Sequence, residues 1–598
     1  MEGILSGFLK HAKQNQSLSA FTVTVISLVL FKRVYRYLKL QNRRKELRAL
    51  ATKKRNERDE LLTKMEETLL AGDLKNDSKI THLSASELLR KLEKGEVTSL
   101  EVTMAFCRTA ARVQKDLSCL AEINFEEAIA LARERDKERK EGKIRGPLHG
   151  LPISIKDQID MAGFDSTCGL SARCYRPAIE DAVIVQILRA AGAIPFVRTN
   201  IPQALFLPES VNAIWGCCKN PFNAKRTSGG SSGGEASLLA ARGSPLGLGT
   251  DIAGSIRGPS LFCGICGFKP TPGRVSCKGI AVPRPNDSNG QAVVLATPGP
   301  MARCVDDLEL VMRVWHEDGK MHNDDSVVPP LSWKSNIYTS SSKKKLKFGY
   351  FTDDGYFDSC AAAKRAVIET VEALKEAGHE VVELKFNFEQ LCWSFVKLMS
   401  AEGGLQGFID SLEGEELNPI YLFLYKTANI PTFLRPFLAK IMDFTGQNRI
   451  GGLVREARPR STYDYWSQNA TMKLQKKALI KKWEELKLDA VVCPPGGVPA
   501  MPHGMSSKLA QASSYTFLWN IVHFPAGVVP TTLVRADEEK YEGRKDSITA
   551  AAKIAGVDSR NMPMGVQVVT LPWKDELCLR AMKIVEDVVK WKIPNPLA

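Results

Sequence analysis

The sequence predicts a layered α/β protein, and three observations support that class. Predicted strands alternate with predicted helices along much of the chain, which is the pattern of a sheet covered by helices. The 598 residues are enough to bury a large core. A glycine- and serine-rich stretch at 227–260 carries leucines at spacings suited to burial, so it is expected inside the domain and not in a flexible linker.

The N-terminal segment has the features of a membrane anchor. Residues 14–31 carry no charged side chain, and Lys32 and Arg33 follow at once. A spanning helix needs about 17–25 mainly apolar residues, so we predict a transmembrane helix at 14–38. Serine and threonine interrupt the apolar run, and a helix lying in the membrane interface is the alternative. Because positive charge follows the anchor, the bulk of the chain is expected in the cytosol.

Net positive charge is concentrated near the same end. Residues 1–60 hold fourteen Lys and Arg against five Asp and Glu, which is +9 of the total of +15. A basic terminus beside an apolar run favours a membrane surface, and the sequence has no nucleic-acid-binding motif, so no nucleic acid partner is predicted. Residues 39–79 are rich in charge, and we predict a charged, solvated helical stalk there, followed by one main domain at 80–598.

The main domain opens with two capping boxes, at Ser84 and at Thr98, each of which predicts a helix start. Apolar runs then predict strands, and stretches of helical period predict helices. The predicted strands and core segments are 151–156, 194–198, 246–249, 346–351, 380–384, 489–494, 523–530 and 564–569. The further predicted helices are 126–141, 181–191, 235–242, 305–315, 361–377, 461–486 and 571–589.

Residues 418–445 predict two short amphipathic helices with a break at Pro431. Apolar residues crowd the first helix and recur at Phe433, Phe437 and Phe444 in the second. Two interpretations remain open at this point. The helices pack in the core, or they form a hydrophobic cap that rests in a membrane face. The predicted N-terminal anchor favours the cap.

Cysteine and histidine usage predicts neither a metal nor a cofactor. The fourteen cysteines are scattered, Cys263 and Cys266 form a lone C-x-x-C, and the adjacent Cys217 and Cys218 suit neither an ordinary metal site nor a disulfide. The eight histidines form no pair at metal-ligand spacing. We therefore expect reduced thiols in a cytosolic environment and no metal ion.

Two serine clusters carry the chemical signal. Gly229–Gly234 contains Ser231 and Ser232, and Thr250–Arg257 contains Ser255. The first cluster matches G-x-S-x-G, but the polar residues 223–228 before it cannot be the buried strand that a nucleophile elbow requires. Backbone N–H groups beside a serine are what an oxyanion hole needs, so the segment predicts acyl transfer at a serine.

Both clusters, the helix and strand between them and the ending Ser-Ile-Arg-Gly-Pro-Ser resemble the amidase signature family. The resemblance implies a single large amidase-signature domain in which helices cover both faces of a mixed central β-sheet. It implies a Ser-Ser-Lys catalytic triad of Lys156, at the end of Pro-Ile-Ser-Ile-Lys-Asp, with Ser231 as the middle member and Ser255 as the nucleophile. No cofactor is implied.

The same resemblance implies substrate-binding residues. The N–H groups of Ile252, Ala253, Gly254 and Ser255 are expected to form the oxyanion hole, although Ala253 stands where glycine is usual in part of the family. Residues 165–171, 524–530 and 571–573 are similar to the fatty acid amide hydrolases within the family. That similarity implies an acyl channel walled by Leu205 and Phe206.

The resemblance implies a membrane-anchored serine hydrolase that cleaves fatty acid amides, such as N-acylethanolamines and primary fatty amides, to a fatty acid and an amine through an acyl-enzyme. Its partners are then a lipid amide and an intracellular membrane such as the endoplasmic reticulum, and a homodimer is allowed. A soluble amidase for small amides, a tRNA-amidotransferase subunit and a membrane-tethered scaffold are the alternatives. The anchor and cap argue against the tRNA enzyme, and the intact triad argues against the scaffold.

The expected chemistry depends on a neutral lysine. Burial should lower the pKa of Lys156 from about 10.4 by several units, so that the amine can take a proton through Ser231 from Ser255. Ser232 is expected to hydrogen-bond Lys156. Asp251 and Arg257 are expected to hold the glycine-rich backbone in place without taking part in the chemistry.

Overall fold

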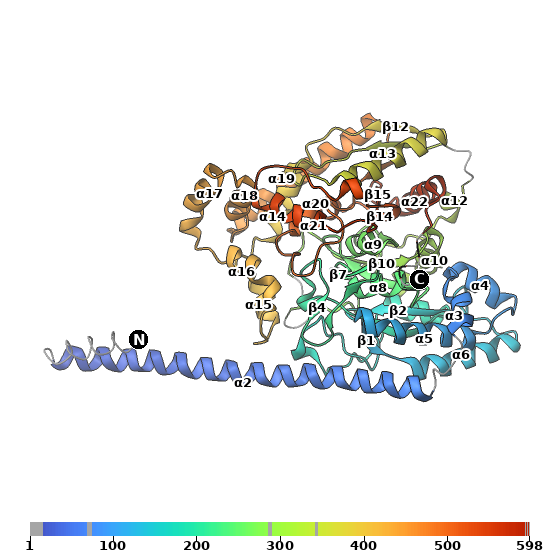
Figure 1. Ribbon diagram of the computed structural model, residues 1–598, viewed down its shortest axis with the longest axis horizontal. Coiled ribbons are helices and arrows are strands. Elements are labelled where there is room, and N and C mark those ends of the chain that lie inside the picture. Colours follow the sequence, from blue (N-terminus) through green and yellow to red (C-terminus); the bar gives the residue numbers. More distant parts are fainter. Residues whose placement is uncertain are drawn as a thin grey trace.

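The computed structural model describes residues 16–68, 74–284, 290–340, 345–592, 594 and 596. An 11-stranded sheet passes through the whole domain (Figure 1), in the order β1-β3-β2-β8-β10-β9-β14-β15-β13-β11-β12. Its strands are β1 Leu120–Ile123, β2 Pro152–Lys156, β3 Ile194–Thr199, β8 Leu246–Asp251, β9 Cys266–Lys269, β10 Thr297–Ala302, β11 Lys347–Tyr350, β12 Glu380–Glu383, β13 Ala490–Cys493, β14 Ala526–Leu533 and β15 Pro563–Val569. Two small hairpins, β4 Val211–Asn212 with β5 Gly216–Cys217 and β6 Lys219–Asn220 with β7 Asn223–Thr227, lie outside it.

The sheet is mixed, as the resemblance implies. Strands β3, β2 and β8 run parallel to one another, and so do β13, β11 and β12. The strands between these two groups pair antiparallel. A continuous sheet of this size makes the main body one domain.

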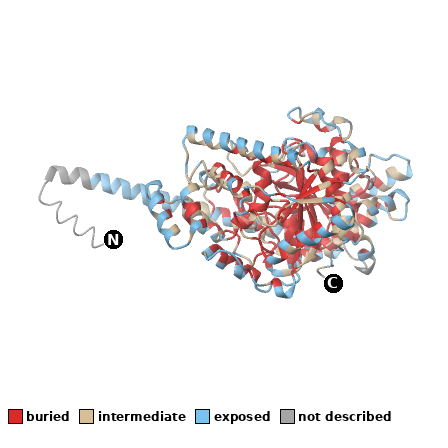
Figure 2. Cartoon of the chain, turned by 90° about the horizontal axis from the view of Figure 1, so that it is seen from above, coloured by how far each residue is buried: buried red, intermediate tan, exposed pale blue. Residues whose placement is uncertain are grey.

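Helices cover both faces of the sheet, and strand β13 shows why. Successive side chains of a strand point to opposite faces. Ala490 and Val492 join one apolar core, while Val491 and Cys493 join the other. Residues of α5 (Ser99–Leu117), α10 (Val305–His316) and α22 (Asp575–Val589) pack in the first core, and residues of α9 (Arg257–Cys263), α14 (Phe388–Met399) and α20 (Ser514–Ile521) pack in the second. Figure 2 shows the buried residues gathered around the sheet between these layers.

The remaining helices complete the layers and the surface. They are α3 Leu74–Thr81, α4 Ala85–Glu93, α6 Phe125–Lys140, α7 Val183–Ala190, α8 Gly233–Ala240, α11 Lys320–Asp324, α12 Ser335–Tyr338, α13 Ala361–Glu376, α15 Gln406–Ser411, α18 Asn448–Glu456, α19 Thr462–Glu485 and α21 Ser547–Gly556. Both predicted capping boxes are present, at the starts of α4 and α5, with Ser84 and Thr98 as the N-cap residues.

The first described helix, α2 (Gln16–Thr68), covers most of the predicted anchor and stalk. Residues 14 and 15 of the predicted transmembrane helix lie outside the described residues. Among the described residues no helix is both long and apolar enough to cross a membrane. The spanning helix expected at 14–38 is not supported by the described part of α2.

The second half of α2 lies along the domain instead of standing free as a solvated stalk (Figure 1). Leu47 and Met65 are almost fully buried. The ammonium of Lys54 lies 2.5 Å from Glu122 and 2.8 Å from Asp165, and both carboxylates belong to the domain. Arg58 donates a hydrogen bond to the carbonyl of Leu120 at the edge strand β1. The first half of α2 projects from the body and is exposed from residue 24 onward (Figure 2).

The two amphipathic helices predicted around Pro431 are present as α16 (Leu422–Ala428) and α17 (Arg435–Phe444). Three phenylalanines of this segment point outward. Phe433, Phe437 and Phe444 are 81%, 65% and 94% exposed, and we call them the cap phenylalanines. Tyr421 and Ala439 are buried and Leu424 packs on an apolar cluster of the domain, so the segment has both an outward and a packed apolar side. Figure 1 shows α16 and α17 at the same end of the molecule as the projecting half of α2.

Candidate active site

Parallel strands bring the two parts of the candidate site to one edge of the sheet. Strands β2 and β8 pair parallel, with Ser154 opposite Gly247 and Ile155 opposite Leu248. Their carboxyl ends therefore lie together, and Lys156 ends β2 as Asp251 ends β8. Ligand sites in open α/β sheets lie in this position, outside the carboxyl ends of parallel strands.

The amine of Lys156 is fully buried and has two polar contacts. Its Nζ atom lies 2.7 Å from Ser231 Oγ and 2.7 Å from Thr250 Oγ1. The Thr250 hydroxyl donates to Gln158 Oε1 at 2.7 Å, and Gln158 Nε2 donates to the carbonyl of Ala281 at 2.8 Å. A hydroxyl has one proton, so Thr250 must accept from Lys156. Sequence reasoning missed Thr250 and Gln158, although both lie in or next to the motifs.

Burial lowers the pKa of Lys156 to about 7, and nearby acidic groups, Asp251 first among them, oppose this shift only in part. An exposed lysine is almost wholly charged at neutral pH. A substantial fraction of this amine is therefore uncharged near pH 7, and the uncharged form can accept a proton.

The two serine clusters touch through their backbones. The N–H of Ser232 donates to the carbonyl of Ser255 at 3.1 Å, and the peptide bond from Gly230 to Ser231 is cis. Ser231 is buried and Ser255 is half-buried. Within the described part of the chain the Ser255 hydroxyl makes no hydrogen bond to Ser231. The structure thus brings Lys156 and Ser231 into contact and sets Ser255 beside them.

The expectation for Ser232 is wrong. Its hydroxyl lies 3.4 Å from both the carbonyl and the N–H of Thr250, and not against Lys156. The reason is the register of β8, which directs the Thr250 hydroxyl to Lys156 and leaves its backbone to Ser232.

Asp251 and Arg257 form a fully buried ion pair that organises the second cluster. The guanidinium of Arg257 lies 2.9 Å from Asp251 Oδ1, and Asn520 Nδ2 donates to the same oxygen at 2.9 Å. Burial alone would raise the pKa of Asp251, but Arg257 holds it well below the ordinary value of 3.8. The carboxylate therefore stays charged, and it also accepts from the N–H of Ile256 at 3.1 Å. These contacts fix the loop that carries Ser255.

Gly254 occupies a position that requires glycine. Its φ is +115°, and a Cβ atom there would lie 2.2 Å from Thr516 Oγ1. Its N–H donates to Asp251 Oδ1 at 2.8 Å, which engages one of the four predicted oxyanion donors. Ile252, Ala253 and Ser255 remain, and across the described residues their N–H groups donate to no protein acceptor.

A buried acid next to the motif has no counterpart in the sequence prediction, which treats Glu235 only as a helix start. The hydroxyl of Ser154 donates to its carboxyl at 2.6 Å, and that of Thr199 donates at 3.0 Å. Burial raises the pKa of Glu235 to about 8, so the group is largely uncharged at neutral pH. It links β2, β3 and α8 beneath Lys156 without adding a full negative charge.

The predicted channel residues lie on an apolar cluster that includes Ala281, near Lys156, and Tyr421, next to α16. Leu205 is half-buried, and Phe206 is 41% exposed with its ring centroid 5.3 Å from that of Phe408. The apolar cluster is defined by Cys168, Leu170, Ala204, Leu207, Ala281, Phe408, Leu412 and Tyr421, with Leu205, Ile420 and Leu424 among the half-buried residues packed on it.

A family model, two relatives and a solved structure all relate this chain to amidases. The model of a protein family described as Amidase matches residues 101–579. Fatty-acid amide hydrolase 1 from Sus scrofa is 36% identical over 511 residues, which are 84% of this chain and 85% of that protein. Fatty acid amide hydrolase 1 from Caenorhabditis elegans is 31% identical over 561 residues, 92% of this chain and 96% of that one. A solved structure titled Fatty acid amide hydrolase superposes with a TM-score of 0.77 at 26% identity, covering 92% of this chain and 97% of its own.

Proposed function

Since this chain belongs to the amidase signature family and is an amidase, we propose that it hydrolyses fatty acid amides, among them N-acylethanolamines and primary fatty amides, to a fatty acid and an amine. The observation that carries the catalytic part of the proposal is the contact of a buried amine, Lys156, with Ser231. The relatives named as fatty acid amide hydrolases and the apolar cluster beside the site support the substrate class.

The triad acts as a proton relay. The Thr250 hydroxyl accepts a hydrogen bond from the uncharged Lys156 amine, whose lone pair takes the hydroxyl proton of Ser231. Ser231 takes the proton of Ser255 as the Ser255 oxygen attacks the amide carbonyl carbon. Ser231 then gives a proton to the leaving nitrogen, the carbon–nitrogen bond breaks and the amine leaves, and Lys156 returns its proton to Ser231. In deacylation water attacks the acyl carbon and loses its proton through Ser231 to Lys156, and the same relay gives a proton back to the Ser255 oxygen as the acyl bond breaks. Ser255 is half-buried, and its carbonyl accepts from the N–H of Ser232, the neighbour of Ser231.

The developing oxyanion needs fixed donors. The N–H groups of Ile252, Ala253 and Ser255 supply them, because the loop that carries them is held by the buried Asp251 carboxylate. Removal of one oxyanion donor from such a site costs about 10²–10³ in kcat in other enzymes. Ala253 supplies the same N–H as the usual glycine.

The acyl chain is proposed to lie along the apolar cluster defined above. Cys168 and Ala281 of this cluster are next to the lysine network, since Gln158 donates to the Ala281 carbonyl. Leu205 and Phe206 line its exposed rim, and Leu424 of α16 lies at the cap end. The apolar cluster therefore extends from residues near the lysine network to α16, and the acyl chain is proposed to follow this direction.

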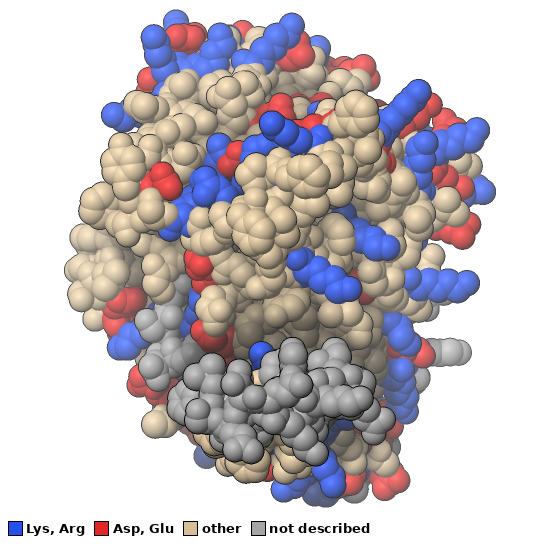
Figure 3. Space-filling model, turned by 90° about the vertical axis from the view of Figure 1, so that its left-hand side faces the viewer, with Lys and Arg blue, Asp and Glu red and all other residues tan. Residues whose placement is uncertain are grey.

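We also propose that the end of the molecule with the cap and the projecting half of α2 rests on a membrane. Exposed apolar side chains gather on both, from Val25 to Leu40 on α2 and on the cap helices. Figure 3 looks onto this end, where much of the visible surface is uncharged and Lys and Arg side chains, with some Asp and Glu, lie on and around it. Apolar side chains insert at the headgroup boundary, and basic side chains attract anionic lipids. Lipid amides would then reach the site from the bilayer.

A chain-length series tests the substrate class. The values of kcat/KM are compared for primary amides and N-acylethanolamines from short to long acyl chains, at substrate concentrations that the detergent micelles fully dissolve. Each buried methylene contributes about 0.8 kcal/mol, so kcat/KM should rise about fourfold per methylene over part of the series. The Phe206→Ala variant should lower the rise for long chains and leave short chains unchanged, while Tyr463→Ala on the exposed face of α19 serves as the control. A flat series would reject the lipid substrates and leave the amidase activity standing.

A further inference from the structure

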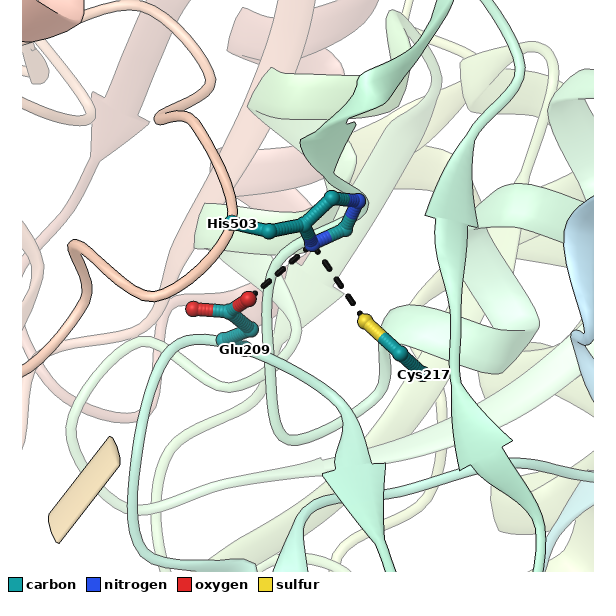
Figure 4. Close-up of side chains that lie close together, drawn as sticks. All are labelled: Glu209, Cys217 and His503. Atoms are coloured by element: carbon teal, nitrogen blue, oxygen red, sulfur yellow. Dashed lines mark hydrogen bonds and ion pairs between the residues drawn. The ribbon is translucent and has the colours of Figure 1, made fainter. Parts of the chain in front are cut away.

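Glu209, Cys217 and His503 form a compact cluster of side chains (Figure 4). His503 Nδ1 lies 3.0 Å from Glu209 Oε1 and 3.3 Å from Cys217 Sγ. The three atoms all lie within 4.8 Å of one another, and among the described residues no other group of three or more His, Cys, Asp or Glu side chains meets that condition. The cluster therefore has the composition and the size of a small metal site.

The hydrogen bonds around the cluster orient all three side chains toward one another. His503 Nε2 faces the carbonyl of Ala224 at 3.2 Å, which leaves Nδ1 facing both the carboxylate and the sulfur. Burial alone would lower the pKa of His503, but Cys217 and Glu209 raise it to about 10, so without an ion the ring is charged and Nδ1 donates to Glu209 Oε1. Glu209 is held in place by the N–H of Gly504, at 3.0 and 3.2 Å from its two oxygens. A divalent cation bound at this point would take the place of the Nδ1 proton between the imidazole and the carboxylate.

We propose that this cluster binds a divalent metal ion, with Zn²⁺ as the best-fitting ion and with Glu209 Oε1, Cys217 Sγ and His503 Nδ1 as its ligands. Zinc takes carboxylate, thiolate and imidazole ligands at about 2.0–2.3 Å in tetrahedral geometry, which separates nitrogen from oxygen and sulfur by about 3.3–3.6 Å. The present separations need to open by only a few tenths of an ångström. Binding displaces the thiol proton of Cys217 and the Nδ1 proton of His503 to solvent, since the thiolate and the neutral imidazole are the ligands.

The surroundings supply what such a site needs. The Ala224 carbonyl and the Gly504 N–H orient the imidazole and the carboxylate, as the hydrogen-bond partners of the ligands do in known zinc sites. Glu209 is buried, whereas Cys217 and His503 are half-buried, with 27% of the His503 side chain exposed. The exposed side gives the ion a path of entry and leaves room for a water ligand.

The site would join two segments that flank the loop before Ser231. The N–H of Ser210 donates to the carbonyl of Gly229, and the N–H of His503 donates to the carbonyl of Lys225 in β7. Strand β7 leads directly into the Gly-Gly-Ser-Ser cluster. An ion held by Glu209, Cys217 and His503 would therefore brace this loop from both sides without touching the reacting atoms.

The sequence predicts no metal, and the structure shows why the sequence gives no signal. Cys217 and His503 are 286 residues apart, and no two ligands have the spacing of a local motif. The pairing of residues 501–503 with 225–227 brings them together.

The test uses the full-length chain, purified in detergent, stripped with a chelator and dialysed. Titration with Co²⁺ should saturate at one equivalent with a sulfur-to-cobalt charge-transfer absorption, and Zn²⁺ should displace it. The Cys217→Ser variant should lose that absorption and weaken binding by more than about 100-fold, since loss of even an outer partner costs about 10–100-fold. Cys277→Ser, which removes an exposed thiol elsewhere, should behave like the wild type.

Thermal unfolding separates loss of metal from loss of fold. In chelator the wild type, Cys217→Ser and Cys277→Ser should unfold at the same temperature, and Zn²⁺ should raise the midpoint of all but Cys217→Ser. Absence of a stoichiometric ion overturns the proposal. The proposal also fails if Co²⁺ binds without a thiolate absorption band, or if Cys217→Ser binds Co²⁺ as tightly as the wild type. It fails as well if Zn²⁺ does not slow the alkylation of Cys217 by iodoacetamide.

Discussion

Replacement of Thr250 by valine should lower the pKa of Lys156 further. The change removes the hydroxyl that accepts a hydrogen bond from Lys156 Nζ at 2.7 Å and nearly keeps the size of the side chain. An ammonium gains more from such an acceptor than an amine does, about 1.5–3 against about 0.5–1.5 kcal/mol. The difference of about 1–1.5 kcal/mol corresponds to about one pKa unit at 1.36 kcal/mol per unit. The pKa of Lys156 should therefore fall from about 7 by about one unit.

The rate of inactivation by a fluorophosphonate reports this pKa without any assumption about the acyl chain. The reagent reacts with an activated serine, so the wild-type rate should rise as pH increases through about 7 and level off above it, because the uncharged lysine is the base. In Thr250→Val the rising limb should move about one unit toward acid. The plateau should fall as well, because Lys156 loses the contact that orients its lone pair toward Ser231.

Thr370→Val is the control, since Thr370 is a buried threonine whose hydroxyl donates to the Ala366 carbonyl within α13. Its pH profile should match that of the wild type. A limb that stays in place or moves toward alkaline pH in Thr250→Val would refute the assigned polarity of the network, in which Thr250 accepts from Lys156. A wild-type rate independent of pH between 6 and 8 would refute Lys156 as the base.

Three further predictions follow from the site and the cap. Ser255→Ala should abolish fluorophosphonate labelling, whereas Ser231→Ala should slow it by about 10²–10⁴-fold, the usual size of a general acid–base contribution, as gel fluorescence against time would show. Gly254→Ala should destabilise the fold by about 2–5 kcal/mol, because the added Cβ meets Thr516 and the backbone is strained. The control Gly258→Ala, with open space at its Cβ, should change stability by less than about 1 kcal/mol. Equal midpoints of thermal unfolding for the two variants would contradict the predicted clash with Thr516. Serine in place of the three cap phenylalanines should lower binding to anionic vesicles more than tenfold, at about 1.5–3 kcal/mol per buried ring, with hydrolysis of a short soluble amide unchanged; unchanged co-sedimentation would exclude the cap from membrane contact.

Most of the sheet could be predicted because its strands are short apolar runs with clear boundaries. Strand β2 and strand β8 follow this rule, and the helix between Ser232 and Arg242 begins and ends near glycines. Strand β10 could not be predicted. It includes Pro298 and Pro300, which cannot donate to a ladder, and yet it lies in the interior of the sheet between β8 and β9. Tertiary pairing with β8 overrides the local preference there.

The candidate site was predictable to the extent that the motif carries it. The contact of Lys156 with Ser231 was expected, and their catalytic roles remain predictions. Thr250 as the partner of Lys156 was not expected, because the register of β8 against β2 decides which hydroxyl reaches the amine. The hydrogen bond from the Gly254 N–H to Asp251 also depends on a backbone turn that composition alone does not specify.

Lys156 can be uncharged although the charged Asp251 lies nearby, and we attribute this to the ion pair between Asp251 and Arg257. Asp251 would hold Lys156 as an ammonium if its charge were unopposed, since Asp251 is the leading group that raises the Lys156 pKa. Arg257, with Asn520 and the backbone N–H groups, satisfies the carboxylate, and its positive charge should offset part of the field of Asp251 at the amine. We therefore predict that the buried ion pair helps to keep Lys156 partly uncharged, beyond its role in holding the loop.

Arg257→Met tests this separation, and its sign is opposite to that of Thr250→Val. Loss of the guanidinium leaves the carboxylate of Asp251 unopposed, so the pKa of Lys156 should rise and the limb of fluorophosphonate inactivation should move toward alkaline pH. Lys269, whose pKa burial also lowers to about 7, should take up part of the response. The free energy of unfolding of the variant should be about 3–5 kcal/mol lower than that of the wild type at neutral pH. This difference between variant and wild type should narrow as pH falls below 3.8, where the aspartate of the unfolded chain is protonated. A shift of the limb toward acid would show that Arg257 does not screen Asp251 from the lysine.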